Sequence, residues 1–212
     1  MARIIIFANG ELPVIEKAGA LISAEDYIIC ADGGTHHALA LGITPHLVVG
    51  DIDSVTKDEV QRLKKAEVPI ELYPRDKNET DLELALNRAL DKSPSSILII
   101  GALGGRLDQT LGNISLLSDS RLAALDARLD DGVEEVFFCN EKSKVEGRRG
   151  DIVSLIPWNG AIKGISTNGL RWSLNHETLY PDKTRGISNE MLNALAEISI
   201  EAGLLLIIHR RL

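Results

Sequence analysis

The chain has 212 residues, of which 44% are hydrophobic and 25% charged, a composition that suits one large globular domain or two small ones. Its 31 acidic and 23 basic residues give a net charge of −8, which argues against a broad nucleic-acid-binding surface. The apolar stretches are too short for a signal peptide or a membrane span, so we expect no membrane association.

Up to about residue 130, short apolar runs alternate with helical patterns. The runs at 3–8, 27–31, 47–50 and 97–100 are bounded by polar or glycine residues and predict buried strands. Helical patterns cover 36–43, 54–69, 80–93 and 107–125, the second of them stopping at Pro69. Thr80, with Glu83 three residues later, indicates a capping box. We therefore predict an α/β domain with a doubly wound, mostly parallel sheet over residues 1–132.

After about residue 130 the pattern changes to short strands separated by Gly, Asn and charged turns. They are expected at 135–140, 151–158, 164–174, 196–203 and 204–211, and residues 188–197 could form a turn or two of helix. This spacing predicts a smaller all-β sandwich domain over residues 133–212.

Acidic residues follow the predicted strands of the first half. Asp32 ends one apolar run, Asp51 and Asp53 end another, and Asp81 begins a helical pattern. Since ligands of parallel sheets bind at the carboxyl ends of the strands, these carboxylates are expected on one rim. Two such charges about 4 Å apart repel by roughly 4 kcal/mol at an effective dielectric near 20, which a divalent cation such as Mg²⁺ would relieve. The alternative is that each Asp only caps a helix or turn.

A glycine loop at residues 101–106 follows the fourth strand and is suited to binding phosphate through its backbone N–H groups. It lacks the GK[ST] ending of a P-loop and the spacing of a dinucleotide-binding fingerprint. Arg106 could grip phosphate oxygens, and Asp108 could hold a metal.

The cysteines and histidines show no pattern of a zinc site. Cys30 and Cys139 form no CxxC pair, and we expect two buried thiols in a protein of the reducing cytoplasm. His36 and His37 are adjacent and would diverge on a helix, so we interpret them as solvated or packing residues.

Six blocks in series carry a family resemblance: ANGELP, ADGGTHHAL, PHLVVGDIDSV, KNETDLELAL, GALGGRLDQTLGN, and STNGLRWSL followed by GISNEM. Over nearly its whole length the chain resembles bacterial thiamine pyrophosphokinases. The resemblance implies transfer of the pyrophosphoryl group of ATP to the hydroxyl of thiamine, giving thiamine diphosphate and AMP. It also implies an α/β nucleotide-binding domain, a β-sandwich, and a homodimer with thiamine held between the two chains.

The resemblance and the residue chemistry together give a candidate site. Mg²⁺ is assigned to Asp51 and Asp81, with Asp32, Asp53 and Asp108 as further candidates, and Asp53 as the candidate proton acceptor. Lys77, Thr80, Gly104, Gly105 and Arg106 are expected to bind the triphosphate, and Trp172, Ser188 and Asn189 to bind thiamine. Asn78 and Gln109 depart from the family pattern, which usually has Asp and His at these positions.

Three other functions share some of these features. A pyrophosphokinase for a pterin-like alcohol would use the same acidic rim, and only the Trp172 block favours thiamine. A phosphatase with Asp51 and Asp53 as its DxD pair would need that pair after the first strand, and here the pair follows a later one, which argues against a phosphatase. A non-catalytic thiamine or nucleotide sensor would have no need of so many mutually repelling carboxylates.

Overall fold

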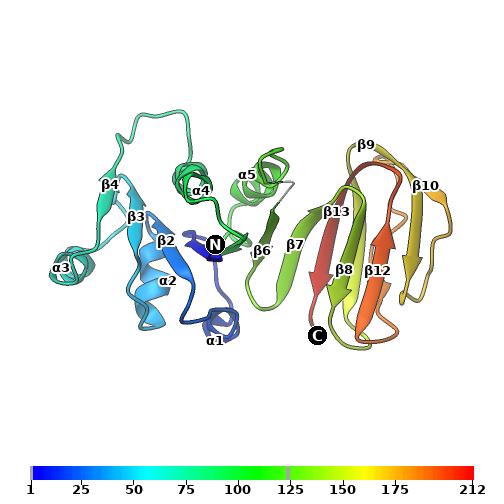
Figure 1. The fold of residues 1–212 in the computed structure, drawn as a ribbon, viewed down its shortest axis with the longest axis horizontal. Helices are drawn as coiled ribbons and strands as arrows, with labels where there is room; N and C mark the ends of the chain where they lie inside the picture. The colour runs from blue at the N-terminus through cyan, green and yellow to red at the C-terminus, as the bar shows by residue number, and fades with distance from the viewer. Residues whose placement is uncertain (1, 123–124) are drawn as a thin grey trace. The chain divides into compact units, whose positions relative to one another are not determined.

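The computed structural model describes residues 2–122 and 125–212. The chain divides after Gly132 into two compact units. The first unit alternates strands and helices (Figure 1). Its elements are β1 (Ile4–Phe7), α1 (Ile15–Gly19), β2 (Tyr27–Ala31), α2 (Gly34–Ala40), β3 (Leu47–Gly50), α3 (Lys57–Lys65), β4 (Ile70–Leu72), α4 (Asp81–Asp91), β5 (Ser96–Ile100), α5 (Leu107–Leu116) and β6 (Asp126–Asp130).

The strands of this unit form a parallel sheet in the order β4-β3-β2-β1-β5-β6. Figure 1 shows α4 and α5 on one side of the sheet and α1 and α2 on the other. Consecutive residues of β1, such as Ile4, Ile5 and Ile6, are therefore all buried, as strands covered on both faces must be. The predicted doubly wound α/β architecture is confirmed.

Helices α3 and α4 begin at a side-chain cap, whereas α1, α2 and α5 do not. Thr56 and Glu59 form a complete capping box at α3, which the sequence analysis did not identify. At α4 Thr80 is the N-cap, as predicted, and its hydroxyl accepts a hydrogen bond from the backbone N–H of Glu83 at 3.2 Å; among the described hydrogen bonds the return bond from Glu83 that would complete the predicted capping box is not found.

Three helices end well before the predicted residue. Helix α2 ends at Ala40 rather than 43, and α3 ends at Lys65, before Pro69. Helix α5 ends at Leu116, after which residues 117–122 form turns; the rest of that prediction includes residues 123–124, outside the described residues.

The second unit consists of strands. They are β7 (Glu134–Cys139), β8 (Lys142–Glu146), β9 (Ile152–Asn168), β10 (Glu177–Leu179), β11 (Asn189–Glu190), β12 (Leu195–Ser199) and β13 (Ala202–Arg210). These strands pair with one another in antiparallel fashion, in the order β7-β13-β9-β12-β8, with β10 and β11 also paired to β9. Residues 188–197 contain strand segments in place of the possible helical turn.

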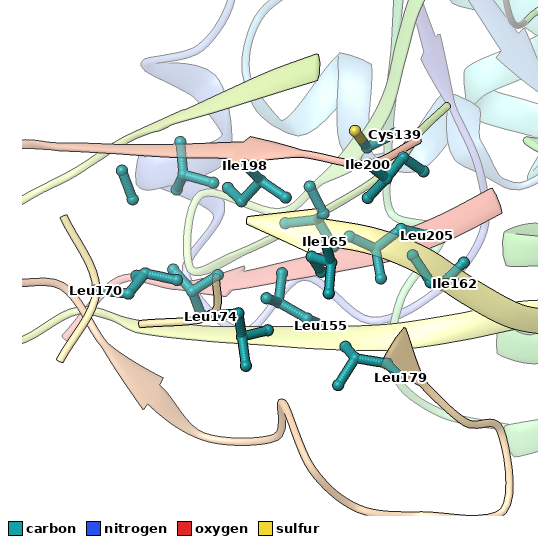
Figure 2. Packing of buried hydrophobic residues seen from close by; sticks show 14 of the residues in the cluster. Cys139, Leu155, Ile162, Ile165, Leu170, Leu174, Leu179, Ile198, Ile200 and Leu205 are labelled. Carbon is teal, nitrogen blue, oxygen red and sulfur yellow. The ribbon is translucent and has the colours of Figure 1, made fainter. Parts of the chain in front are cut away.

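Strand β9 serves both layers of the sandwich. Its first part pairs with β13 and its last part with β12, so two segments predicted as separate strands are one bent strand. The bend falls at Asn159 and Gly160, which have φ of 59° and 145°. Figure 2 shows buried side chains from these strands, among them Leu155, Ile165 and Ile198, packed into one core. This arrangement confirms the predicted all-β sandwich.

Candidate active site

The first unit has a pocket of about 640 Å³ at the carboxyl ends of β1 to β5. Strand order reverses between β1 and β5, and such switch points are where open α/β sheets bind ligands. The loop after β1 (8–11) and the loop after β5 (101–106) line the pocket together with residues that follow β2, β3 and β4.

Acidic residues from three different loops meet at this pocket. One carboxylate oxygen each from Asp32, Asp51 and Asp53 lies within 4.8 Å of the others. Asp81, the first residue of α4, is close by: a Cβ built on Gly50 would lie 3.0 Å from Asp81 Oδ1 and 3.1 Å from Asp32 Cβ. Asp53 belongs to the cluster but is exposed and does not line the pocket.

Two of these carboxylates have a buried oxygen that receives no hydrogen bond from a described residue. These oxygens are Asp32 Oδ1 and Asp81 Oδ1. Lys77 Nζ lies 3.0 Å from Asp81 Oδ1, but as an ion pair outside hydrogen-bond geometry. The pKa of Asp81 is raised, mainly by burial; Lys77 opposes the rise, and the charges of Asp32 and Asp51 add to it. An all-oxygen group of this kind fits a hard divalent cation.

The backbone at the acidic loops is strained. Asp32 and Ile52 have φ of 42° and 54°, a region that costs a side-chain-bearing residue on the order of 1–3 kcal/mol and is concentrated at functional sites. Both residues lie within two positions of a strand end, and Asp32 and Asp51 line the pocket there.

Three basic side chains line the same pocket: Arg75, Lys77 and Arg106. Arg75 Nε lies 3.8 Å from Asp53 Oδ2, and Arg106 makes two hydrogen bonds to Asp108, of 2.5 and 3.1 Å. Asp108 is exposed, does not line the pocket, and is not part of the acidic cluster. The structure therefore separates Asp108 from the other candidate metal ligands.

The glycine loop is held open beside α5. Gly104 and Gly105 have φ of 78° and 68°, a conformation that favours glycine. Because neither residue has a side chain, their backbone lies bare at the pocket wall. Thr110 Oγ1 and Asn113 Nδ2 donate to the carbonyls of Gly104 and Ala102, at 3.2 and 2.8 Å, and so fix the loop. Asn113 was not identified from the sequence, although it belongs to one of the family blocks.

Glu11 and Arg75 also line the pocket and were not proposed from the sequence. Both lie in loops without regular structure, where no periodicity indicates them. For Glu11 the sequence signals were the turn-forming Asn-Gly pair before it and its place in the first family block.

The adjacent histidines, interpreted as solvated or packing residues, are half-buried and contact neighbouring segments. His36 Nδ1 and Nε2 lie 2.6 Å from Glu59 Oε1 and 2.7 Å from the carbonyl of Ser54. His37 Nε2 lies 2.8 Å from the carbonyl of Gly10. They do diverge on α2, and each contacts a different loop of the rim.

The three thiamine candidates of the second unit lie in two paired segments. Trp172 is 58% exposed, with the Arg171 guanidinium carbon 5.1 Å from its ring centroid. Asn189 is buried and holds the Trp172 backbone: its Oδ1 accepts from Trp172 N at 3.0 Å, and its Nδ2 donates to Trp172 O at 2.7 Å. Ser188 is exposed, with φ of 57°. Asn189 therefore acts on Trp172, because three of its four hydrogen-bonding positions are used within the protein.

Each of the two units overlaps a match to a known protein-family domain. Residues 18–134 match the family described as "Thiamin pyrophosphokinase, catalytic domain", and residues 140–205 match "Thiamin pyrophosphokinase, vitamin B1 binding domain". The chain belongs to the thiamine pyrophosphokinase family. Thiamine pyrophosphokinase of Bacillus subtilis (strain 168) is 33% identical over 210 residues, which cover 98% of each chain.

Solved structures of the family have the same fold. A crystal structure of thiamine pyrophosphokinase from Bacillus subtilis matches with a TM-score of 0.89 and 31% identity over 99% of each chain. One of a thiamin pyrophosphokinase family protein from Enterococcus faecalis matches with a TM-score of 0.81 and 26% identity, again over 99% of each. These findings do not favour the pterin, phosphatase or sensor alternatives.

The two departures from the family pattern lie in different surroundings. Gln109 is in α5 and lines the pocket, whereas Asn78 is exposed and does not. Cys30 and Cys139 are buried and free, as predicted. No helix in the described part of the chain is long and apolar enough to cross a membrane.

Proposed function

We propose that the chain transfers the pyrophosphoryl group of ATP to the hydroxyl of thiamine, giving thiamine diphosphate and AMP. Residues 1–132 would bind the nucleotide and carry the chemistry, and residues 133–212 would bind thiamine. The observation that carries this proposal is the pocket in which the carboxylates of Asp32, Asp51 and Asp81 lie together with three basic side chains, and in which buried oxygens of Asp32 and Asp81 receive no hydrogen bond from a described residue. A metal triphosphate is complementary to such a pocket, because its cation would neutralise the carboxylates and its phosphates would neutralise the basic side chains.

The triphosphate would lie along the glycine loop and the basic side chains. Backbone N–H groups of Gly104 and Gly105, at the start of α5, offer donors that a helix N-terminus makes favourable for anions. Arg106 is exposed and paired with Asp108, and an exposed ion pair of this kind contributes little stability, so phosphate oxygens can replace the carboxylate. Lys77 and Arg75 would neutralise the remaining charge, and Thr80 would keep its capping role at the pocket wall.

Mg²⁺ fits the acidic cluster. We propose Asp51 and Asp81 as its main ligands, with Asp32 and Asp53 beside them; Asp108, exposed and engaged by Arg106, is the weakest of the candidates. When bound, the cation would neutralise charge on the phosphoryl oxygens and so make the phosphorus more open to attack by an alcohol.

The reaction itself needs positioning more than covalent chemistry. The hydroxyl oxygen of thiamine forms a bond to the β-phosphorus, the bond from that phosphorus to the oxygen of the α-phosphate breaks, and AMP leaves with that oxygen. The hydroxyl proton goes to a carboxylate. We propose Asp53, because it is exposed at the edge of the cluster, where an alcohol can approach it.

On the second unit, Trp172 would stack on the flat, cationic thiamine, and Asn189 would orient Trp172 while Ser188 offers a hydroxyl to the ring edge. We propose a homodimer in which thiamine is bound between the two chains. Apolar side chains left exposed on each unit support this, including Leu107 on α5 and Ile187 on the sandwich. We propose the cytoplasm as its location, since both thiols are free.

The test is incubation of the purified protein with thiamine, Mg²⁺ and ATP, followed by chromatography of all nucleotides and thiamine phosphates. We expect AMP and thiamine diphosphate in equal amounts. Formation of ADP and thiamine monophosphate would show a simple kinase, and absence of any product would overturn the proposal. Omitting Mg²⁺ with a chelator present should abolish both products.

A further inference from the structure

His36 joins two helices to the loop that carries Asp51 and Asp53. On one side its Nδ1 contacts Glu59 of α3, and on the other its Nε2 contacts the carbonyl of Ser54, the residue directly after Asp53. The second oxygen of Glu59 accepts from the backbone N–H of Thr56 at 2.9 Å and from its hydroxyl at 2.7 Å. One carboxylate therefore closes the cap of α3 and holds the imidazole.

The chemistry of these contacts determines the state of the ring. A carboxylate and a backbone carbonyl can only accept hydrogen bonds, and a neutral imidazole has a single N–H. Both contacts of His36 are made together only when the ring carries two protons. The pKa of His36 is raised, first by the hydrogen bond to Glu59; burial opposes this, and the Ser54 carbonyl and the charges of Glu59 and Asp32 add to the rise.

The loop held in this way has few other ties. Within residues 51–55, Asp53 N donates to Asp51 Oδ1 at 3.2 Å, Val55 N donates to Ile52 O at 3.2 Å, and the Ser54 hydroxyl donates to Asp53. From outside the loop, the exposed Arg75 Nε lies 3.8 Å from Asp53 Oδ2. Ile52 is in the strained left-handed region, which persists only when surrounding contacts fix it. The contact from α2 to Ser54 O is shorter, at 2.7 Å, and comes from outside the loop.

We propose that His36 is a positioning residue for the divalent cation: through Ser54 it fixes the loop that presents Asp51 and Asp53. The proposal rests on the proposed function, in which these carboxylates bind the cation. It predicts that loss of the imidazole weakens use of Mg²⁺ while leaving the thiamine site on the other unit unchanged.

The experiment compares His36→Gln with His46→Gln. His46 is a matched control because it also bonds a backbone group, accepting from Ile28 N at 2.9 Å, but it lies at the start of β3, opposite the pocket. Hydrogen exchange on the metal-free proteins reports the loop directly. We expect residues 51–56 to exchange at least about tenfold faster in His36→Gln than in wild type, the lower end of the effect expected for loss of one charge-assisted hydrogen bond. His46→Gln should leave that segment unchanged.

Steady-state rates give the second readout. In His36→Gln the Mg²⁺ concentration for half-maximal rate should rise at least about fivefold, with the thiamine KM within about twofold of wild type. Unchanged exchange at 51–56, or equal changes in both histidine variants, would overturn the proposal. If His36→Gln does not fold, Glu59→Gln tests the same contact from the other side, because the glutamine amide has no negative charge to hold the imidazolium of His36. A wild-type protein that forms no product would refute the proposed function, while the exchange comparison would still decide whether His36 fixes the loop.

Discussion

Asn189→Ala tests whether one buried amide controls the proposed thiamine site. The substitution removes three hydrogen bonds: two with the backbone of Trp172 and one from the N–H of Glu190 at 2.9 Å. At about 1 kcal/mol net for each bond, the upper limit of the loss is roughly 3 kcal/mol. Because Trp172 is 58% exposed, water can replace part of it, and we expect about 1–2 kcal/mol. That loss lowers Tm by roughly 2–8 °C for a chain of this size.

Besides this modest loss of stability, Asn189→Ala should raise the KM for thiamine. Stacking a cation on Trp contributes about 0.5–2 kcal/mol, so Trp172→Ala should raise the thiamine KM roughly 2- to 30-fold. If Asn189 acts through Trp172, Asn189→Ala should raise the KM by a similar factor, and the double variant should show no further rise. Initial rates at varied thiamine and saturating ATP measure all three, with the ATP KM as internal reference.

The control is Asn193→Ala, an exposed asparagine of the same unit, for which we expect neither change. The reasoning is refuted if Asn189→Ala lowers Tm and leaves the thiamine KM unchanged. It is refuted equally if the effects of the two substitutions on KM simply multiply, since independent residues behave in that way.

Three further substitutions test the first unit. Asp51→Asn should abolish turnover with the circular dichroism spectrum and Tm nearly unchanged, and a variant that kept a substantial rate would remove Asp51 from the metal site. Gly50→Ala should lower both Tm and activity, because Gly50 has φ of 143° and its new Cβ would lie 3.0 Å from Asp81 Oδ1; wild-type values of both would contradict this. For His36 the folded pKa is raised, so the stability it adds is fully present below its unfolded pKa of about 6.5 and is lost as pH rises through the folded value. The Tm difference between wild type and His36→Gln, measured by calorimetry, should therefore shrink from pH 6 to pH 9, and a constant difference would show that the charge of the ring does not stabilise the fold.

The sequence was sufficient to predict the elements that bury long apolar runs. Strands β1, β2, β3 and β5 are such runs, and the acidic residues after them are placed by the geometry of a parallel sheet. Short elements were missed. Helix α1 spans five residues, and β4 three residues that are not buried, so neither has enough apolar residues to produce a recognisable period.

Contacts between side chains far apart in the sequence could not be predicted in the same way. His36 and Glu59 are separated by 23 positions, and Asn189 and Trp172 by 17. Each pair depends on how separate elements pack, which composition and spacing do not specify. The same limit applies to β9, where the Asn159–Gly160 bend looked like a turn between two strands.

The path of β9 also bears on the order in which the chain folds as it is synthesised. The sheet of the first unit uses only strands that precede residue 131, so its pairings can all form early in translation. In the second unit β13 lies between β7 and β9, although it is the last strand to be made. Until residues 202–210 leave the ribosome, β7 and the first part of β9 each have an edge open to other chains. Truncation or stalling near residue 200 should therefore leave a folded α/β unit attached to an aggregation-prone half-sandwich.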